Sequence, residues 1–268
     1  MKPIGVFDSG LGGLTVAAAL NRKLPNEQLI YLGDTARLPY GTKSASTVIR
    51  YSLQIANFLV SQGIKLLVAA CNTASAHAVD ALREALPIPV LGVVEPGARE
   101  AAHRTTLGQI GVIGTLGTVG SGAYRRALQD IRSDLVVFSQ PCPLLVPLAE
   151  EGWHEHPVTA EVARHYLSQL RQQSGDLDTI VLGCTHYPLL KKTLADQASG
   201  VFGHPVELVD SADAVAQAVA DELVDKDLTQ RGSRVAEDRF FVTDDSRFAE
   251  LAARFLGRRI SAVENADI

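Results

Sequence analysis

The chain has 268 residues, of which 46% are hydrophobic and 21% are charged. This composition is typical of a globular protein with a large core, and it excludes a disordered chain, a collagen-like repeat and a small disulfide scaffold. The formal net charge is −5, from 25 Lys and Arg against 30 Asp and Glu, and no basic block stands out. Electrostatic capture of nucleic acid is therefore not expected.

The sequence also shows no sign of export or of membrane insertion. No window of about eighteen consecutive apolar residues occurs, and MKPIGVFDSG leads into a predicted strand without the apolar region of a signal peptide. The three cysteines, Cys71, Cys142 and Cys184, are odd in number and widely spaced, which argues against a disulfide framework. We expect a cytoplasmic protein with free thiols and no membrane partner.

Short apolar runs alternate with helical patterns along almost the whole chain. The predicted strands, in chain order, are residues 4–7, 28–32, 65–70, 90–93, 109–113, 134–138, 179–182, 206–209 and 240–243. Several runs are apolar throughout, such as LLVAA at residues 66–70, which is typical of parallel strands covered on both faces. Residues 44–61 instead carry apolar side chains at helical spacing, from Ile49 to Val60. The alternation predicts an α/β fold with mainly parallel sheets.

Two parts of the chain resemble each other. VAACNTAS ends a predicted strand at Cys71, and VLGCTHYP ends another at Cys184, while GVFDSG and GVIGTLG both suggest a strand followed by a glycine-rich turn. We therefore expect two pseudo-symmetric, doubly wound domains, the first formed by residues 1–97 plus 210–268 and the second by residues 98–209. Because ligands of open α/β sheets bind beyond the carboxyl ends of the strands, we expect the active site in a cleft between the domains.

The two matching cysteines are the first candidates for chemistry. A helical pattern follows Cys71, so its sulfur would lie near a helix N-terminus, where the helix dipole favours a thiolate. A single cysteine is more often a small buried hydrophobic residue, and we interpret Cys142 in PCPLLVPL in that way. The matching contexts of Cys71 and Cys184 favour a reactive role for this pair.

The spacing of histidines and cysteines does not favour a metal site. Structural zinc normally uses close Cys-x₂₋₄-Cys or His-x₃₋₅-His pairs, and the chain contains neither CxxC nor HxxxH. His186 follows Cys184 by two residues, so in an extended backbone both side chains would point the same way. Its imidazole could relay protons or tune the thiol, or it could be a hydrogen-bonded histidine in a turn.

The glycine-rich segment DSGLGG at residues 8–13 only partly matches a dinucleotide-binding fingerprint. Thr15 stands where the third glycine would be, and Asp8 would lie beside the phosphates. Asp34, at the end of the second predicted strand, does mimic the ribose-binding acid of that fold. The sequence GxxxxGK[ST] is absent, which excludes a P-loop. We interpret Asp8 either as a carboxylate of a strand-end site or as a helix cap.

Two further segments carry weaker signals. The Tyr40-Gly41 turn, in the loop after the second predicted strand, could donate hydrogen bonds to a carboxylate. Glu150 and Glu151 close an apolar stretch, so that one of them could enter the cleft or both could lie at a solvated helix end.

Five motifs together are more specific than any one of them. GVFDSGLGGLT, GDTARLPYG, AACNTAS, VPLAEEG and LGCTHYPLL, in this order and spacing, closely resemble the glutamate racemases of the aspartate/glutamate racemase family. The resemblance runs from Ile4 to about Ser211. Aspartate and hydantoin racemases share the paired cysteines, but their N-terminal loop lacks the DSGLGG segment.

The resemblance implies an isomerase that interconverts L-glutamate and D-glutamate for peptidoglycan biosynthesis, cell-wall biogenesis and cell shape, as a homodimer without a cofactor. It implies that Cys71 and Cys184 are the catalytic acid/bases, with Asp8 assisting Cys71, and with Glu150 and His186 assisting around Cys184. The motif VPLAEEG favours Glu150 over Glu151. The residues that it assigns to substrate binding are Asp8, Ser9, Tyr40, Gly41, Asn72, Thr73, Thr115, Thr118, Thr185 and His186.

The chemistry of racemisation agrees with a pair of like residues. Inverting a stereocentre by proton exchange needs a base on one face of the α-carbon and an acid on the other, each about 3–3.5 Å from it. Thiols with an ordinary pKa of about 8.5 can serve if their surroundings keep one as thiolate. A pyridoxal phosphate route would need a Schiff-base lysine, and none of the seven lysines has a convincing strand-end context.

Other functions stay open at this stage. The nearest is a racemase of another amino acid such as aspartate; others are a non-catalytic module that binds an anionic amino acid, and a nucleotide-binding oxidoreductase, which the imperfect glycine pattern disfavours. Some relatives carry an N-terminal extension and depend on a peptidoglycan precursor as activator. The first predicted strand here begins at Ile4, so we expect no obligatory activator.

Overall fold

The computed structural model describes residues 2–232, 236–244, 248–260 and 262–268. The chain divides into two compact units, the first formed by Met1–Val93 with Ala212–Ile268 and the second by Val94–Ser211. The first unit is therefore built from two separate stretches of sequence, and the second from one.

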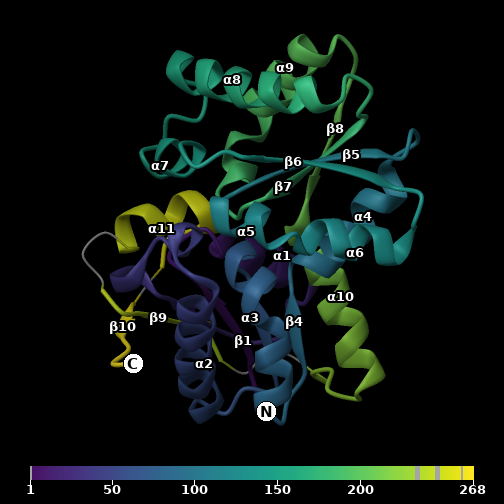
Figure 1. Ribbon diagram of the computed structural model, residues 1–268. Helices are drawn as coiled ribbons and strands as arrows, with labels where there is room; N and C mark the ends of the chain where they lie inside the picture. Colours follow the sequence, from purple (N-terminus) through teal and green to yellow (C-terminus); the bar gives the residue numbers. More distant parts are fainter. Residues whose placement is uncertain (1, 233–235, 245–247, 261) are drawn as a thin grey trace. The chain divides into compact units, whose positions relative to one another are not determined.

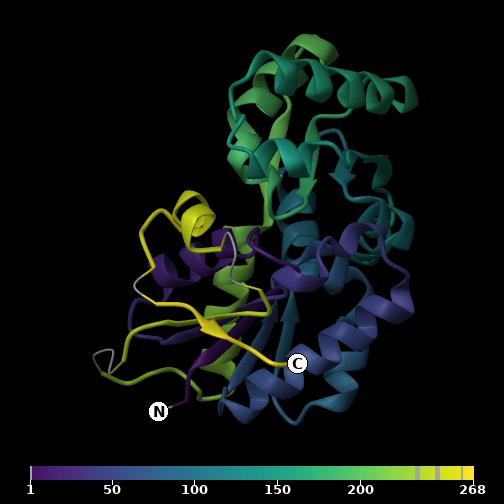
Figure 2. The same cartoon turned by 90° about the vertical axis from the view of Figure 1, so that its left-hand side faces the viewer.

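The first unit is a parallel sheet covered by helices (Figure 1). Its strands are β1 (Ile4–Asp8), β2 (Leu29–Gly33), β3 (Leu66–Ala69), β4 (Val90–Gly92), β9 (Arg239–Val242) and β10 (Glu264–Asn265). Their order is β10-β9-β2-β1-β3-β4, and each pair of neighbours is parallel. The helices are α1 (Leu14–Lys23), α2 (Ala45–Ser61), α3 (Asn72–Ala85), α10 (Ser211–Asp225) and α11 (Phe248–Leu256), with 3₁₀ turns η1 (Thr35–Arg37) and η2 (Tyr40–Thr42). The yellow C-terminal strands β9 and β10 thus extend a sheet begun by the N-terminus, as Figure 2 also shows.

Alternate side chains of these strands enter two different cores, which explains their continuous apolar sequence. Phe7 and Phe241 are buried in the cluster that includes residues of α2 and α3. Tyr31 packs instead against Phe240 and Phe248, with ring centroids 6.3 and 6.2 Å away. Helices therefore cover both faces of the sheet.

The second unit repeats this plan on a smaller scale. Its strands are β5 (Gln109–Gly114), β6 (Val136–Pro141), β7 (Thr179–Gly183) and β8 (Glu207–Asp210), in the parallel order β6-β5-β7-β8. Its helices are α4 (Val94–Arg104), α5 (Leu116–Ser121), α6 (Ala123–Ile131), α7 (Leu145–Glu150), α8 (Pro157–Gln173) and α9 (Lys191–Phe202), with the 3₁₀ turn η3 (Tyr187–Leu190). In Figure 1 the pair α8 and α9 covers one face of this sheet, and α4 with α6 covers the other.

In both sheets the direction in which successive strands are added reverses at the equivalent strand. From β1 the chain passes to β2 on one side, whereas β3, on the other side of β1, leads outward to β4. In the same way β5 passes to β6, whereas β7 leads outward to β8. Loops at such switch points diverge and leave a crevice at the carboxyl ends of the strands. The two switch points lie between β1 and β3, and between β5 and β7.

The predicted fold class is confirmed: the protein is α/β with parallel sheets. Each predicted strand is present, with ends displaced by a few residues, whereas the two-residue strand β10 was not predicted. The helix predicted over residues 44–61 is α2, with Ser44 as its N-cap. Among the described residues, no helix combines the length and hydropathy that crossing a bilayer requires.

Candidate active site

The first switch point holds Cys71 and the loop that follows β1. Cys71 is the N-cap of α3, and its sulfur lies 3.6 Å from the hydroxyl oxygen of Ser9. The side chain is 6% exposed and takes part in no disulfide. A helix N-terminus stabilises negative charge. A cysteine at this position therefore forms a thiolate more readily than a cysteine in the middle of a helix.

Asp8 is fully buried at the end of β1, and its carboxylate holds the loop that follows. Its Oδ2 accepts the Gly10 N–H at 2.9 Å, and the Gly10 carbonyl accepts the Tyr31 hydroxyl at 2.8 Å. Burial, followed by the charges of Asp8 and Cys71, raises the pKa of Tyr31 well above its usual value, so the hydroxyl remains a donor. Gly13, rather than Asp8, is the N-cap of α1, so the interpretation of Asp8 as a helix cap was wrong.

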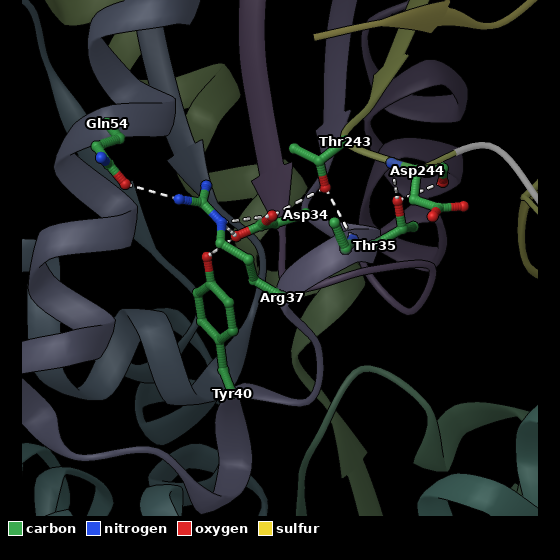
Figure 3. Close-up of polar contacts among 8 residues, drawn as sticks. Asp34, Thr35, Arg37, Tyr40, Gln54, Thr243 and Asp244 are labelled. Carbon is green, nitrogen blue, oxygen red and sulfur yellow. Dashed lines mark hydrogen bonds and ion pairs between the residues drawn. The ribbon is translucent and has the colours of Figure 1, made fainter. Parts of the chain in front are cut away.

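The turn that contains Tyr40 and Gly41 belongs to the same unit. Both residues are buried, and η2 packs against α3, the helix that Cys71 caps. The Tyr40 hydroxyl donates to Asp34, whose carboxylate also accepts from Arg37 (Figure 3). Asp34 is buried and engaged by these donors, which leaves no carboxylate edge for the ribose of a dinucleotide.

The second switch point holds Cys184, the residue that follows β7. The Cys184 sulfur lies 3.7 Å from His186 Nδ1, and His186 Nε2 lies 3.0 Å from Glu150 Oε1. Cys184 and His186 are each 6% exposed. Sulfur, imidazole and carboxylate therefore form a line of three interacting groups.

The charge state of His186 follows from these contacts. Burial alone would lower the pKa of His186, but the hydrogen bonds with Cys184 and Glu150 outweigh burial and raise that pKa to about 10. The imidazole therefore carries a proton at neutral pH, with a carboxylate on one side and a sulfur on the other. Glu150 ends α7 and makes this contact, whereas Glu151 is exposed.

Thr115 and Thr118 follow β5 and shape the other side of the second switch point. Thr115 is the N-cap of α5: its Oγ1 accepts the Thr118 N–H at 3.1 Å and contacts Thr118 Oγ1 at 3.0 Å. Thr118 is 1% exposed. The two hydroxyls thus fix each other at a helix N-terminus.

The strand registers place the two sulfurs in equivalent positions. In the first sheet Phe7 lies opposite Ala69, so two residues further along each strand Ser9 is level with Cys71. The contact between the Ser9 hydroxyl and the Cys71 sulfur agrees with this register.

In the second sheet Gly114 lies opposite Gly183, so Thr115 is level with Cys184. Thr115 is therefore the counterpart of Ser9, and Gly114 is the counterpart of Asp8. The second unit has no carboxylate in the strand position that Asp8 occupies, and the carboxylate near its sulfur reaches it through His186.

The remaining predicted residues follow the two cysteines directly. Asn72 and Thr73 form the first turn of α3, and Thr185 lies between Cys184 and His186; all three are buried. The first unit thus gathers Asp8, Ser9, Tyr40, Gly41, Cys71, Asn72 and Thr73, and the second gathers Thr115, Thr118, Glu150, Cys184, Thr185 and His186.

Cys142 lies in the core of the second unit, as predicted. Its side chain has no exposed surface, its sulfur donates to the Gln140 carbonyl at 3.4 Å, and burial raises the pKa of its thiol. Among the described residues, no group of three or more His, Cys, Asp or Glu side chains is arranged to hold a metal ion.

Comparison with known proteins adds an independent line of evidence. The sequence pattern of the Asp/Glu/hydantoin racemase family matches residues 4–219. A glutamate racemase of Geobacter metallireducens is 52% identical over 263 residues, which cover 98% of this chain and 95% of the relative.

Solved structures give the same picture. A glutamate racemase isoform of Bacillus anthracis superposes with a TM-score of 0.92 at 40% identity, over 100% of this chain and 98% of that one. A glutamate racemase of Francisella tularensis, solved in complex with D-glutamate, superposes with a TM-score of 0.90 at 36% identity, over 99% and 97% of the two chains.

Proposed function

Because this chain belongs to the Asp/Glu/hydantoin racemase family and is therefore an isomerase, we propose that it interconverts L-glutamate and D-glutamate, with Cys71 and Cys184 as paired acid and base. The observation that carries the proposal is the equivalent register of the two thiols. Each follows a central strand of its own parallel sheet, at the switch point where such sheets bind ligands.

The reaction needs two proton transfers and no change of oxidation state. One thiolate takes the α-proton, which leaves a carbanion stabilised by the neighbouring carboxylate of the substrate. The other thiol then donates its proton to the opposite face of the α-carbon and becomes a thiolate. Each turnover thus exchanges the protonation states of the two sulfurs, and the reverse reaction uses the same groups in the opposite order.

Different partners assist the two sulfurs. The protonated imidazole of His186 lies 3.7 Å from the Cys184 sulfur, and Glu150 keeps that imidazole protonated and oriented. Cys71 caps the N-terminus of α3, where Ser9 lies level with it across the sheet and Asp8 directly precedes Ser9. Asp8 assists Cys71 in this proposal, as Glu150 and His186 assist Cys184.

The substrate is held by polar groups that adjoin the two sulfurs. In this proposal Ser9, Asn72 and Thr73 bind it in the first unit, together with the Tyr40-Gly41 turn. Thr115, Thr118, Thr185 and His186 bind it in the second unit. N–H groups at the start of helices suit the carboxylates and the developing carbanion, because fixed donors stabilise charge without reorganising. In this proposal the chain's own side chains supply every proton, fixed donors stabilise the carbanion, and no cofactor takes part.

Incubation with L-glutamate in D₂O tests the reaction directly. We expect D-glutamate to form and deuterium to enter the α-position. Chiral chromatography measures the D-glutamate, and NMR measures the deuterium. A protein that binds glutamate without exchanging its α-proton would be a binding module instead. Parallel incubation with aspartate separates a glutamate racemase from an aspartate racemase.

The cysteines are tested by single substitutions. We expect Cys71→Ala and Cys184→Ala each to lower kcat/KM by about 10²–10⁴-fold or more in both directions, because each removes one proton-transfer group. Cys142→Ala is the matched control: it also removes a buried thiol, but one in the core, and should keep its racemase activity. Full activity in either of the first two variants would contradict the two-base mechanism.

The wider role follows the same proposal. D-glutamate would be supplied to bacterial peptidoglycan synthesis, and hence to cell-wall biogenesis and cell shape, by a homodimer in the cytoplasm. The absence of a disulfide among Cys71, Cys142 and Cys184 supports a reducing compartment. Light scattering of the purified protein tests the dimer, and complementation of a D-glutamate auxotroph tests the role in the cell wall.

A further inference from the structure

Asp34 is a side chain with no exposed surface whose two carboxylate oxygens accept hydrogen bonds from three residues (Figure 3). Arg37 Nε approaches both oxygens, at 2.9 and 2.8 Å. Thr243 Oγ1 donates to Oδ1 at 2.9 Å, and the Tyr40 hydroxyl donates to Oδ2. Burying a charged carboxylate costs free energy unless hydrogen bonds and opposite charges compensate for the lost water. The three donors around Asp34 supply that compensation.

Asp34 also joins two segments that the proposed function assigns to substrate binding. Its main-chain N–H donates to the Asp8 carbonyl at 3.0 Å, and its side chain holds Tyr40. Asp8 ends β1, and Tyr40 begins η2. One residue therefore connects the loop after β1 to the turn Tyr40–Thr42.

The far side of Asp34 is tied to the C-terminal stretch of the first unit. Thr243 follows β9 and is 209 residues from Asp34 in the sequence. Its hydroxyl also accepts the Ala36 N–H at 2.9 Å, and the neighbouring Thr35 hydroxyl accepts the Asp244 N–H at 2.8 Å. The carboxylate is thus anchored on strand ends rather than carried by a loose loop.

Two contacts limit what Tyr40 can offer a ligand. Its hydroxyl donates to Asp34, and its carbonyl accepts the Lys43 N–H at 3.0 Å within the 3₁₀ turn. Because the hydroxyl is already engaged, the turn would bind a substrate through its main-chain N–H groups. The position of those groups beside α3 then depends on the bond between Tyr40 and Asp34.

We propose that Asp34 is a positioning residue that acts through Tyr40, holding the turn Tyr40–Thr42 where its main chain binds a carboxylate of the substrate. The inference rests on the proposed function, because it concerns that same substrate. Asp34 itself does not touch the reacting atoms. Its role belongs to substrate binding, so KM is the quantity that responds.

A double-mutant cycle tests this role. We expect Asp34→Asn and Tyr40→Phe each to raise KM for glutamate by about tenfold, the scale of one hydrogen bond to a charged group, with a smaller change in kcat. The double variant should be no worse than the poorer single variant, because both substitutions break the same link. Steady-state kinetics with both enantiomers gives kcat and KM separately.

Two further variants serve as a second test of the carboxylate and as a control. Thr243→Val removes the donor to Oδ1 from the far side and should raise KM in the same direction by a smaller factor, even where Asp34→Asn does not fold. Gln54→Ala is the matched control: it removes the exposed partner of Arg37 Nη1, at 2.6 Å, and leaves every contact of the carboxylate in place. Its KM should equal that of the wild type.

Additive effects of Asp34→Asn and Tyr40→Phe on KM would show that the two residues act separately, and a lower Tm with an unchanged KM would assign Asp34 to folding alone; either result would overturn the proposal. Failure of the proposed function has a different signature. In that case the wild-type protein itself would not racemise glutamate, whatever the variants do.

Discussion

His186 lies between a sulfur and a carboxylate, and this position determines how the folded protein responds to pH. Its pKa is raised from 6.5 to about 10 in the folded state. Between these two values the folded protein keeps a proton on His186 that the unfolded chain releases. The stabilisation is therefore complete below about pH 6.5 and is lost as the pH rises towards 10.

The first prediction concerns this pH dependence. We expect the free energy of unfolding of the wild type to fall between pH 6.5 and 10, and Glu150→Gln to reduce that fall, because Glu150 helps to raise the pKa of His186. Urea titrations at a series of pH values measure both slopes. Identical slopes in wild type and variant would show that Glu150 does not act on His186.

The second prediction separates two adjacent carboxylates. Glu150→Gln should lower kcat/KM by about tenfold or more, because it removes a charge-assisted hydrogen bond from His186. Glu151→Gln, one residue further along and exposed, should leave kcat/KM within about twofold of the wild type. The reverse order of effects would mean that the other acid serves the site in solution.

At the scale of elements, the loop after β1 is shaped by glycines that admit close backbone contacts. A Cβ at Gly33 would lie 2.4 Å from the Gly10 carbonyl oxygen, and one at Gly13 would lie 2.5 Å from the Asp8 Cβ. The end of β2 therefore needs glycine for the loop to cross it. The same loop is held by Tyr31 and carries Asp8.

The third prediction follows from that crossing. Gly33→Ala should lower the free energy of unfolding by about 1–3 kcal/mol, because the backbone of Gly10 has to move. It should also lower kcat/KM, by up to about a hundredfold, because a displacement of about 1 Å near the chemistry is costly. Denaturant titration and steady-state kinetics measure the two effects.

Gly200→Ala is the control for this substitution. Gly200 lies in α9 with open space where a Cβ would be, so alanine there should raise stability by about 0.5–1 kcal/mol and leave activity unchanged. A stable, fully active Gly33→Ala variant would show that the loop relaxes easily.

Hydrophobic patterning predicts most elements of this fold, for physical reasons. Strands buried on both faces are apolar throughout, so β3, with LLVA, is visible in the sequence. The strand β10 has only Glu264 and Asn265, and it forms because β9 presents a free edge, which no local pattern records. The helix after Cys71 is predicted by a different signal, because its apolar residues recur at helical spacing.

The candidate site was predictable only where its residues are contiguous. Motifs such as DSGLGG, CNT and CTH gather the groups around each sulfur on single turns of the chain. Its position at the end of the second predicted strand makes Asp34 resemble a ribose-binding acid, whereas its bond to Thr243, 209 residues away, gives no local signal. The place of Glu150 near Cys184 came only from the resemblance, and its contact with His186 was not predicted, since that contact joins the end of α7 to the residue before η3.

At the scale of the molecule, the first unit has to join two distant stretches of sequence. Lys65 forms a buried ion pair with Glu27 at 2.6 Å and donates to the Leu228 carbonyl, also at 2.6 Å. Glu27 in turn accepts the Gln230 N–H at 2.8 Å. This cluster of four residues connects the C-terminal stretch of the first unit to the segments that lead into β2 and β3.

The fourth prediction concerns this connection. Lys65→Met should lower the free energy of unfolding by about 3–5 kcal/mol, because it leaves Glu27 charged and buried without its partner. The double variant Lys65→Met with Glu27→Gln should recover part of that loss. Arg22→Met is the control: it removes an exposed pair with Asp213 and should cost less than about 1 kcal/mol. Equal losses from Lys65→Met and Arg22→Met would contradict a special role for burial.

The mismatch between Asp8 and its counterpart Gly114 has a thermodynamic consequence. Mirror-image substrates have the same free energy in water, so a racemase must obey an equilibrium constant of one however unlike its two halves are. Unequal turnover numbers for the two enantiomers must be compensated by unequal Michaelis constants, leaving kcat/KM identical in both directions. Every substitution in either half must then change kcat/KM by the same factor in both directions, and the unequal surroundings of the two sulfurs can affect only kcat and KM taken separately.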